Sequence, residues 1–216
     1  MRRPPSRNCR GAPESLALLK VEPTAADCHP HGMDADAREY LAIQRFYGQR
    51  RARRSGVLYL QHIDEGLWVL RALGATEQAQ RAYCLHPLVQ EDDERTAAWT
   101  QALAMNADLS LPPVDGVSED PRILALALDY RETANAALSH RPDLKTPEDI
   151  ALSKEPEVND MLRADKVQNY KDFIRYHRGR HPRSAELEHY FQLWLARLDV
   201  TPGQVTRWHA ALDRLT

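Results

Sequence analysis

The stretch from Arg53 to Glu94, RRSGVLYLQHIDEGLWVLRALGATEQAQRAYCLHPLVQEDDE, decides the fold. It predicts two consecutive helices, one opening at His62 and ending at Gly74, the other running from Thr76 to His86, where Pro87 is expected to stop it. Two histidines at the inner ends of adjacent helices can share one metal ion. They can equally be core histidines whose ring nitrogens are satisfied by hydrogen bonds.

The rest of the chain extends this helical pattern. Apolar residues at helical spacing and start signals such as Asp120-Pro121 and Thr201-Pro202 predict further helices. Their expected ranges are 34–47, 95–105, 122–139, 155–177, 185–198 and a last helix from 202. No β pattern, repeat or glycine-rich phosphate loop is present, so the expected fold class is all-α. The proline-rich residues 1–32 are expected to be a disordered tail, and residues 34–216 the folded domain.

Composition narrows the class of protein. The chain has 216 residues, 43% of them hydrophobic, and a net charge of −2. The balanced charge argues against general nucleic-acid binding, and the basic runs QRRARR and RYHRGRHPR carry no aromatic ladder for stacking bases. Three cysteines do not make a disulfide framework, and no apolar run is long enough for a membrane span. The expectation is a soluble cytoplasmic protein with no membrane partner.

The segment RRSGVLYLQH resembles a known motif. It is similar to the RxSGxPYxxH opening of the hydrolase domain of RelA/SpoT proteins and their small stand-alone relatives, with Leu58 at the motif's proline. The resemblance makes His62 the first metal ligand. It implies that Arg53, Ser55 and Tyr59 bind the substrate, with Arg53 clamping phosphate.

Two later segments carry the same resemblance. LRADKVQNYKDF, residues 162–173, is similar to the family's LADKLxNLRDL helix, which makes Asp165 the last metal ligand and Asn169 a nucleotide contact. EHYFQLWLARL, residues 188–198, resembles the EYFxWA helix. The resemblance runs from about residue 53 to 198 in short blocks. It implies an HD-domain-like helical bundle that uses manganese to remove the 3′-pyrophosphate of guanosine tetra- and pentaphosphate, with some relatives acting on NADPH.

Asp165 also stands out without the family. It shares one helical stripe with Leu162 and Phe173. A carboxylate on an apolar face is costly to bury unless a cation or a metal ion pairs with it. The pattern therefore predicts a positive partner for Asp165.

The chain departs from the family where the second histidine lies. The family's LHDxxED segment falls on Leu85 to Glu91, so His86 is kept, but Pro87 replaces the metal-binding aspartate, and the catalytic Glu-Asp pair becomes Gln90 and Glu91. Glu91 is the remaining candidate for proton transfer. One hypothesis is that Asp129 or Glu132 supplies the lost carboxylate. The other is that both face a polar seam or pair with Arg131.

Two functions follow as hypotheses. The first is a metal-dependent phosphohydrolase that acts on a nucleotide, with a divalent ion, manganese or zinc, held by His62, His86 and Asp165. The second is a catalytically degenerate HD-fold domain that binds a nucleotide or a protein partner without hydrolysis. Pro87 and Gln90 favour the second hypothesis, and the retained ligand set favours the first.

Overall fold

The computed structural model describes residues 37–53, 55–89, 118 and 120–215. The predicted tail, Gln90, Glu91 and the helix expected at 95–105 lie outside the described residues. In the described part the secondary structure is helical, without a strand, which confirms the all-α prediction. The elements are α1 (Arg38–Tyr47), α2 (Tyr59–Leu73), α3 (Glu77–Val89), α6 (Pro121–Ala136), the 3₁₀ turn η2 (Pro147–Asp149), α7 (Pro156–Asp172), the π-helical turn η3 (Phe173–His177), α8 (Ser184–Arg197) and α9 (Pro202–Leu212).

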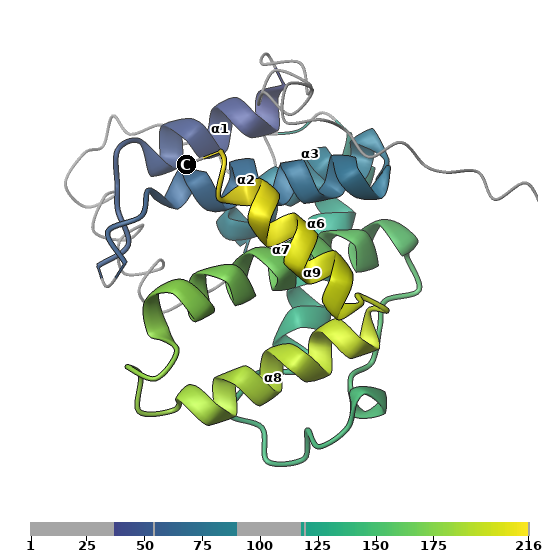
Figure 1. Cartoon of the computed structure of the whole chain (residues 1–216). Coiled ribbons are helices and arrows are strands. Elements are labelled where there is room, and N and C mark those ends of the chain that lie inside the picture. Colours follow the sequence, from purple (N-terminus) through teal and green to yellow (C-terminus); the bar gives the residue numbers. More distant parts are fainter. Residues whose placement is uncertain (1–36, 54, 90–117, 119, 216) are drawn as a thin grey trace, which may run out of the picture.

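Helix α7 is the centre of the packing. It contacts α2, α3, α6, α8 and α9, and Figure 1 shows α9 crossing over it with α8 running below. Helix α3 also packs against α1 and α6. A helix surrounded in this way places its side chains against several neighbours, so polar groups on α7 must find partners on other helices.

Local signals begin and end several of these helices as predicted. Asp120 accepts a hydrogen bond from the backbone N–H of Arg122, with Pro121 at the first helical position. Thr201 forms a capping box at the start of α9. Gly74 ends α2 with φ 70° and ψ 30°, a left-handed conformation that costs glycine no steric strain.

The prediction that Pro87 stops its helix is wrong. Helix α3 continues to Val89 with Pro87 inside it. In a regular helix the residue at this position would donate its N–H to the carbonyl of Tyr83, and proline has no N–H. That carbonyl instead accepts a hydrogen bond from Nδ1 of His86 at 2.6 Å. The missing backbone bond is thereby replaced by a side-chain bond one residue earlier.

The helix predicted from 155 to 177 is present, but its last turn is a different kind of helix. The α-helical part ends at Asp172, and Phe173–His177 is wound as a π-helix. Single π-helical turns often occur at functional sites, because they change which side chains face a cavity. Phe173 and His177 both line the cavity described below.

None of the described helices has the length and apolar character needed to cross a membrane.

Candidate metal centre and cavity

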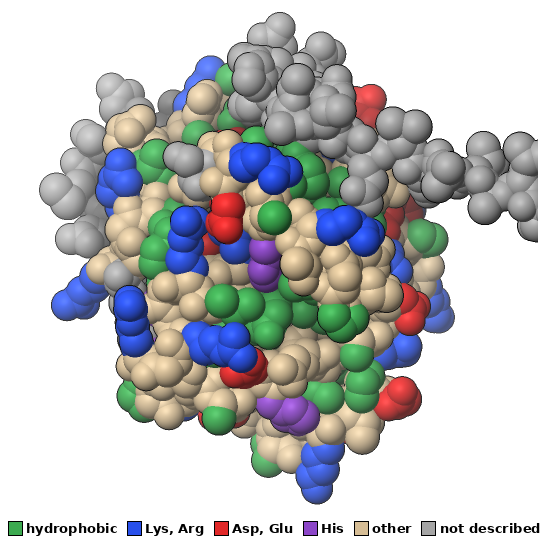
Figure 2. Space-filling model, in the orientation of Figure 1, with side chains coloured by type: hydrophobic (Ala, Val, Ile, Leu, Met, Phe, Trp, Pro, Cys, Tyr) green, Lys and Arg blue, Asp and Glu red, His purple; other side chains and the backbone are tan. Residues whose placement is uncertain are grey.

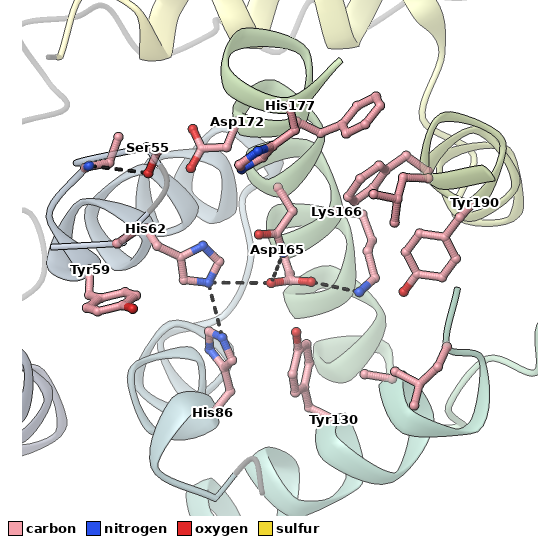
Figure 3. A pocket seen from close by; sticks show the side chains of 18 of the residues that line it. Ser55, Tyr59, His62, His86, Tyr130, Asp165, Lys166, Asp172, His177 and Tyr190 are labelled. Carbon is pink, nitrogen blue, oxygen red and sulfur yellow. Dashed lines mark hydrogen bonds and ion pairs between the residues drawn. The ribbon is translucent and has the colours of Figure 1, made fainter. Parts of the chain in front are cut away.

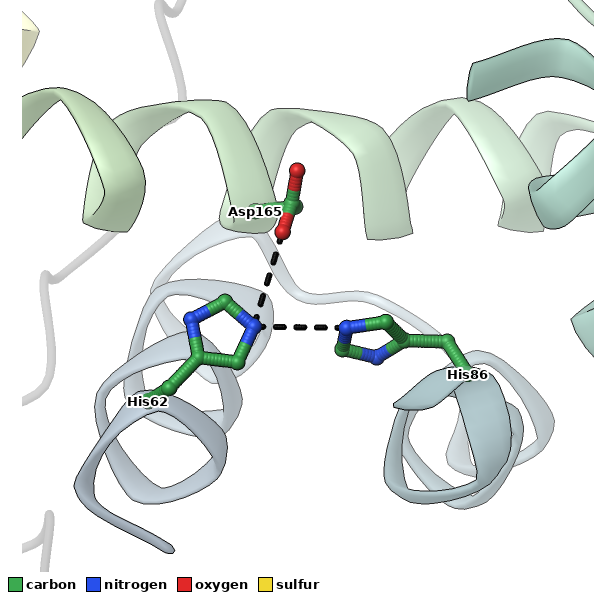
Figure 4. A group of neighbouring side chains, drawn as sticks. All are labelled: His62, His86 and Asp165. Atoms are coloured by element: carbon green, nitrogen blue, oxygen red, sulfur yellow. Dashed lines mark hydrogen bonds and ion pairs between the residues drawn. The ribbon is translucent and has the colours of Figure 1, made fainter. Parts of the chain in front are cut away.

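Three helices bring three potential metal ligands together. His62 comes from α2, His86 from α3 and Asp165 from α7, and each offers a ligand atom within 4.8 Å of the other two (Figure 4). The Nε2 atoms of the two histidines are 3.3 Å apart, and Nε2 of His62 lies 3.5 Å from Oδ1 of Asp165. The prediction that these side chains converge is confirmed.

The hydrogen bonds behind His62 fix the role of its outer ring nitrogen, Nδ1. Its Nδ1 lies 2.5 Å from Oε1 of Gln168. The amide of Gln168 is oriented by its own Nε2, which donates to Glu65 at 3.2 Å and to Asp172 at 2.9 Å. An amide oxygen can only accept, so Nδ1 of His62 is the donor, and Nε2 is turned toward His86, Asp165 and the Tyr83 hydroxyl.

The same argument holds for His86. Its Nδ1 faces the backbone carbonyl of Tyr83, which can only accept. Nδ1 of His86 is therefore a donor, and its Nε2 faces Nε2 of His62. Carboxylate or carbonyl partners on the outer nitrogen are the usual arrangement for histidines that bind metal ions.

The two Nε2 atoms lie at hydrogen-bond distance from each other, 3.3 Å, beside a carboxylate, so the site can hold either a proton on one ring nitrogen or a metal ion between the three side chains. A divalent ion fits this geometry. Two ligand atoms about 2.0–2.2 Å from a tetrahedral ion lie roughly 3.3–3.6 Å apart, and the distances from Nε2 of His62 to His86 and to Asp165, 3.3 Å and 3.5 Å, fall in this range. Two imidazole nitrogens and one carboxylate oxygen suit zinc, and they also accept manganese.

The carboxylate of Asp165 is held by donors on both oxygens. Asn169 donates to Oδ1 at 2.8 Å and Lys166 to Oδ2 at 2.9 Å. Burial alone would raise the pKa of Asp165, but Lys166 and the two histidines outweigh burial and hold that pKa well below its usual range. The carboxylate is therefore ionised and oriented. The positive partner predicted for Asp165 is present as Lys166.

Tyr130 from α6 contacts both His86 and Asp165. It is buried against the ring of His86, with ring centroids 4.9 Å apart. Burial, together with the neighbouring Asp165 carboxylate to which its hydroxyl bonds, raises the pKa of Tyr130 well above its usual range. The hydroxyl consequently remains protonated and acts as a further donor to Asp165.

Lys166 is a buried lysine at the same site. Its Nζ lies 5.0 Å from the ring centre of Trp194 and 5.8 Å from that of Tyr190, so both rings contribute cation–π attraction. Burial would lower the pKa of Lys166, but Asp165 outweighs burial and raises it. Lys166 is therefore charged, and it is paired before any ligand arrives.

A second buried ion pair supports the hydrogen bond behind His62. Lys171 on α7 pairs with Glu65 on α2, and both side chains are buried. Glu65 in turn accepts from the amide of Gln168. Burying two charges is tolerated when they pair and further hydrogen bonds reach them, as the bonds from Gln61 and Gln168 to Glu65 do.

A cavity of about 410 Å³ opens onto the three ligands. Figure 3 shows His62 and His86 at one side, Asp165 in the middle, and Lys166 and Tyr190 at the other side. The rest of the lining is mostly apolar and aromatic and includes Leu138, Phe173, Leu187 and Phe191. On the face seen in Figure 2, Lys and Arg side chains lie around a patch of hydrophobic and histidine side chains. The cavity thus combines a polar end with an apolar wall.

Some of the residues predicted to bind substrate line the cavity, and others do not. Ser55, Tyr59 and Asn169 line the cavity. Arg53 is exposed, and it is not among the lining residues. Gln90 and Glu91, predicted as catalytic, lie outside the described residues.

The hypothesis that Asp129 or Glu132 replaces the lost aspartate is wrong. Asp129 accepts hydrogen bonds from Thr133 at 3.1 Å and from Ser153 at 2.6 Å, away from the ligand group. Glu132 is exposed. The carboxylates of α6 face outward or toward the loop before α7, because Tyr130 occupies the side of α6 that meets α3 and α7.

Several residues of the site were not predicted. Lys166 and Gln168 lie inside the quoted DKVQN block, so their proximity to Asp165 was a signal that could have been used. Tyr83, Tyr130 and His177 had no comparable signal. Their place in the site depends on how α3, α6 and η3 pack around α7.

No family model matches the chain, and neither curated proteins nor solved structures contain a significant match.

Proposed function

We propose that the protein is a metal-dependent phosphohydrolase of the HD type that acts on a phosphorylated nucleotide. The observation that carries the proposal is the convergence of His62, His86 and Asp165, whose two histidine Nε2 atoms lie 3.3 Å apart beside an ionised carboxylate. Two imidazole nitrogens and a carboxylate oxygen that converge in this way are a ligand set that suits a divalent cation. The helical fold and the order of the quoted motifs support an HD-like bundle of the RelA/SpoT hydrolase type.

The charge of the cavity favours an anionic substrate. The charges of Asp165 and Lys166 cancel, so a divalent ion would leave an excess of positive charge at the polar end. An ion held there would supply Lewis acidity for a phosphoryl oxygen and acidify water. Phosphate groups carry the negative charge that such a site attracts, and the aromatic lining offers flat surfaces for a base.

The chain's own residues would then bind and orient the substrate and exchange protons with it. Asn169, which already bonds Asp165, faces the cavity and can orient a ribose or phosphate oxygen. Glu91 is the proposed proton donor or acceptor. Asp172 is a second candidate for this role, because it lines the cavity and burial raises its pKa. The proposed ligands are His62, His86 and Asp165.

The test begins with metal analysis of protein purified without chelator. The expected result is one zinc or manganese ion per chain, lost in His62→Ala and His86→Ala. His189→Ala is the matched control, since His189 is exposed and does not line the cavity. Phosphate release is then measured with guanosine tetraphosphate, NADPH and simple nucleotides.

Three outcomes separate the hypotheses. Metal-dependent phosphate release that disappears with either histidine supports the hydrolase. Bound metal and bound nucleotide without release would favour the degenerate binding domain. Wild-type protein that takes up neither zinc nor manganese would contradict the metal site.

A further inference from the structure

The apolar wall of the cavity leaves hydrophobic surface uncovered. Leu138, which follows α6, is 36% exposed, and among the described residues only one other large hydrophobic side chain is comparably exposed. Leu187 and Phe191 on α8 are partly exposed as well. All three line the cavity. Apolar surface of this kind favours binding, because a ligand that covers it removes it from water.

Phe191 is held in place by other aromatic rings. The centre of its ring lies 5.6 Å from those of Tyr170 and Phe173 and 5.3 Å from that of Tyr190. Ring pairs at these separations attract each other. Neither Phe173 nor Phe191 belongs to the main hydrophobic core of the described domain, although both line the cavity. The two rings therefore form a fixed aromatic surface that serves the cavity rather than the core.

A short series of contacts joins this surface to the candidate metal centre. Lys166 donates to Asp165 at 2.9 Å, and its Nζ lies 5.8 Å from the ring centre of Tyr190. Figure 3 shows Lys166 between Asp165 and Tyr190. Tyr190 in turn contacts Phe191. Because the polar and the aromatic end line one cavity, a single ligand can occupy both.

We propose that Phe191 is a specificity-determining residue, on which the base of a nucleotide stacks while its phosphate lies at the polar end of the cavity. The proposal rests on the proposed function and assigns the part of the chain that recognises the base. Phe173, Leu187 and Leu138 would complete the apolar surroundings of the base.

Two features favour a heterocyclic ring over an alkyl chain as the occupant. An aromatic side chain attracts a second ring in an offset or edge-to-face arrangement. In addition, Asn169 and Asp172 line the same cavity and precede Phe173 by about one helical turn or less. Amide and carboxylate groups can bond the polar edge of a base, whereas an alkyl chain offers them no partner.

The experiment compares the wild type with Phe191→Leu, Phe191→Tyr and Phe46→Leu. Leucine stays apolar but lacks a planar face, and tyrosine keeps the ring. Phe46 on α1 is the matched control, because it is a partly exposed phenylalanine that does not line the cavity. Binding of guanosine 5′-monophosphate, ribose 5-phosphate and octyl phosphate to metal-free protein is measured by ligand-observed NMR, which detects weak affinities.

The nucleotide should bind the wild type at least tenfold more tightly than either ribose 5-phosphate or octyl phosphate. In Phe191→Leu this preference should fall about tenfold, as expected for the loss of a base–aromatic stack, with ribose 5-phosphate unaffected. Phe191→Tyr and Phe46→Leu should keep the wild-type preference. Octyl phosphate or ribose 5-phosphate binding the wild type as well as the nucleotide does, or an unchanged preference in Phe191→Leu, would overturn the proposal.

The design separates this proposal from the proposed function. If the wild type takes up no metal and releases no phosphate, the hydrolase fails, yet the preference of metal-free protein for the nucleotide still decides the role of Phe191. If metal-dependent phosphate release is found without a preference for the nucleotide, the hydrolase stands and the base subsite is refuted. If Phe191→Leu does not fold, the comparison of the three ligands on the wild type and on Phe191→Tyr remains decisive.

Discussion

Lys166 and a bound metal ion would both contact the carboxylate of Asp165. Replacing Lys166 by methionine tests this arrangement. The Nζ of Lys166 bonds Oδ2 of Asp165 at 2.9 Å, while Oδ1 faces His62. Methionine keeps much of the length and the contact with Trp194 but removes the charge. In metal-free protein this substitution leaves a buried carboxylate without its cation, which costs about 3–5 kcal/mol of folding free energy.

Metal binding should respond in the opposite direction. An ion about 2 Å from the carboxylate would lie roughly 5 Å from Nζ. At an effective dielectric constant of about 20, a divalent ion and an ammonium group at that distance repel by about 6 kcal/mol. Relief of even a fraction of this repulsion should tighten zinc binding at least tenfold, or about 1.4 kcal/mol. Saturating zinc should therefore recover that much or more of the stability lost in Lys166→Met.

Lys171→Met provides the control. Lys171 is the other lysine of α7 that is buried in an ion pair, but its partner is Glu65. It should lose a similar amount of stability, with a deficit that zinc does not reduce. Both variants are measured by urea unfolding with chelator and with excess zinc. Equal deficits for Lys166→Met in the two conditions would refute the reasoning, because Asp165 would then serve only as the partner of a structural ion pair.

Three further predictions concern groups behind the ligands and the buried Glu39 of α1. In Gly66→Ala the new methyl group would overlap the ring of Tyr83, so we expect about 1–3 kcal/mol of lost stability, seen in thermal unfolding, together with weaker zinc binding. Gln168→Ala removes the acceptor that orients one ligand histidine, so a zinc titration should show affinity reduced by about 10–100-fold with little change in secondary structure. Burial would raise the pKa of Glu39, but hydrogen bonds, chiefly the one from Arg81, outweigh burial and lower it. The stability that the ionised Glu39 contributes is therefore fully present above its ordinary pKa of 4.5. It is lost as the pH falls through the lowered pKa. Acid unfolding of Glu39→Gln should show a shallower loss of stability below about pH 4.5 than the wild type, and identical curves would contradict this.

The positions of the helices followed from local features of the sequence. Gly74, Asp120 and Thr201 act within one turn of the helix that they end or begin. Apolar periodicity likewise depends only on residues a few positions apart. Such signals are complete in the sequence, which is why the described helices largely agree with the predicted ranges. Pro87 is the exception, because a side chain from the neighbouring residue replaced its missing hydrogen bond.

The three potential ligands could also be named from the sequence. Asp165 lay on an apolar stripe that demanded a positive partner, and the quoted motifs assigned His62 and His86. What the sequence did not define was the partner itself. Lys166 is adjacent in the chain, but whether its side chain turns to Asp165 or to solvent depends on the rings of Trp194 and Tyr190 on α8.

The environment of the ligands was decided by the tertiary structure. His62 and Gln168 are separated by 106 positions, and no local pattern links them. Tyr130 occupies the side of α6 where a carboxylate was expected, and Arg53 remains at the surface. Helix formation depends on interactions within a few residues. The partners of a buried polar group depend instead on which helices pack against it. Those partners are in place only once α2, α3, α6 and α8 have packed around α7.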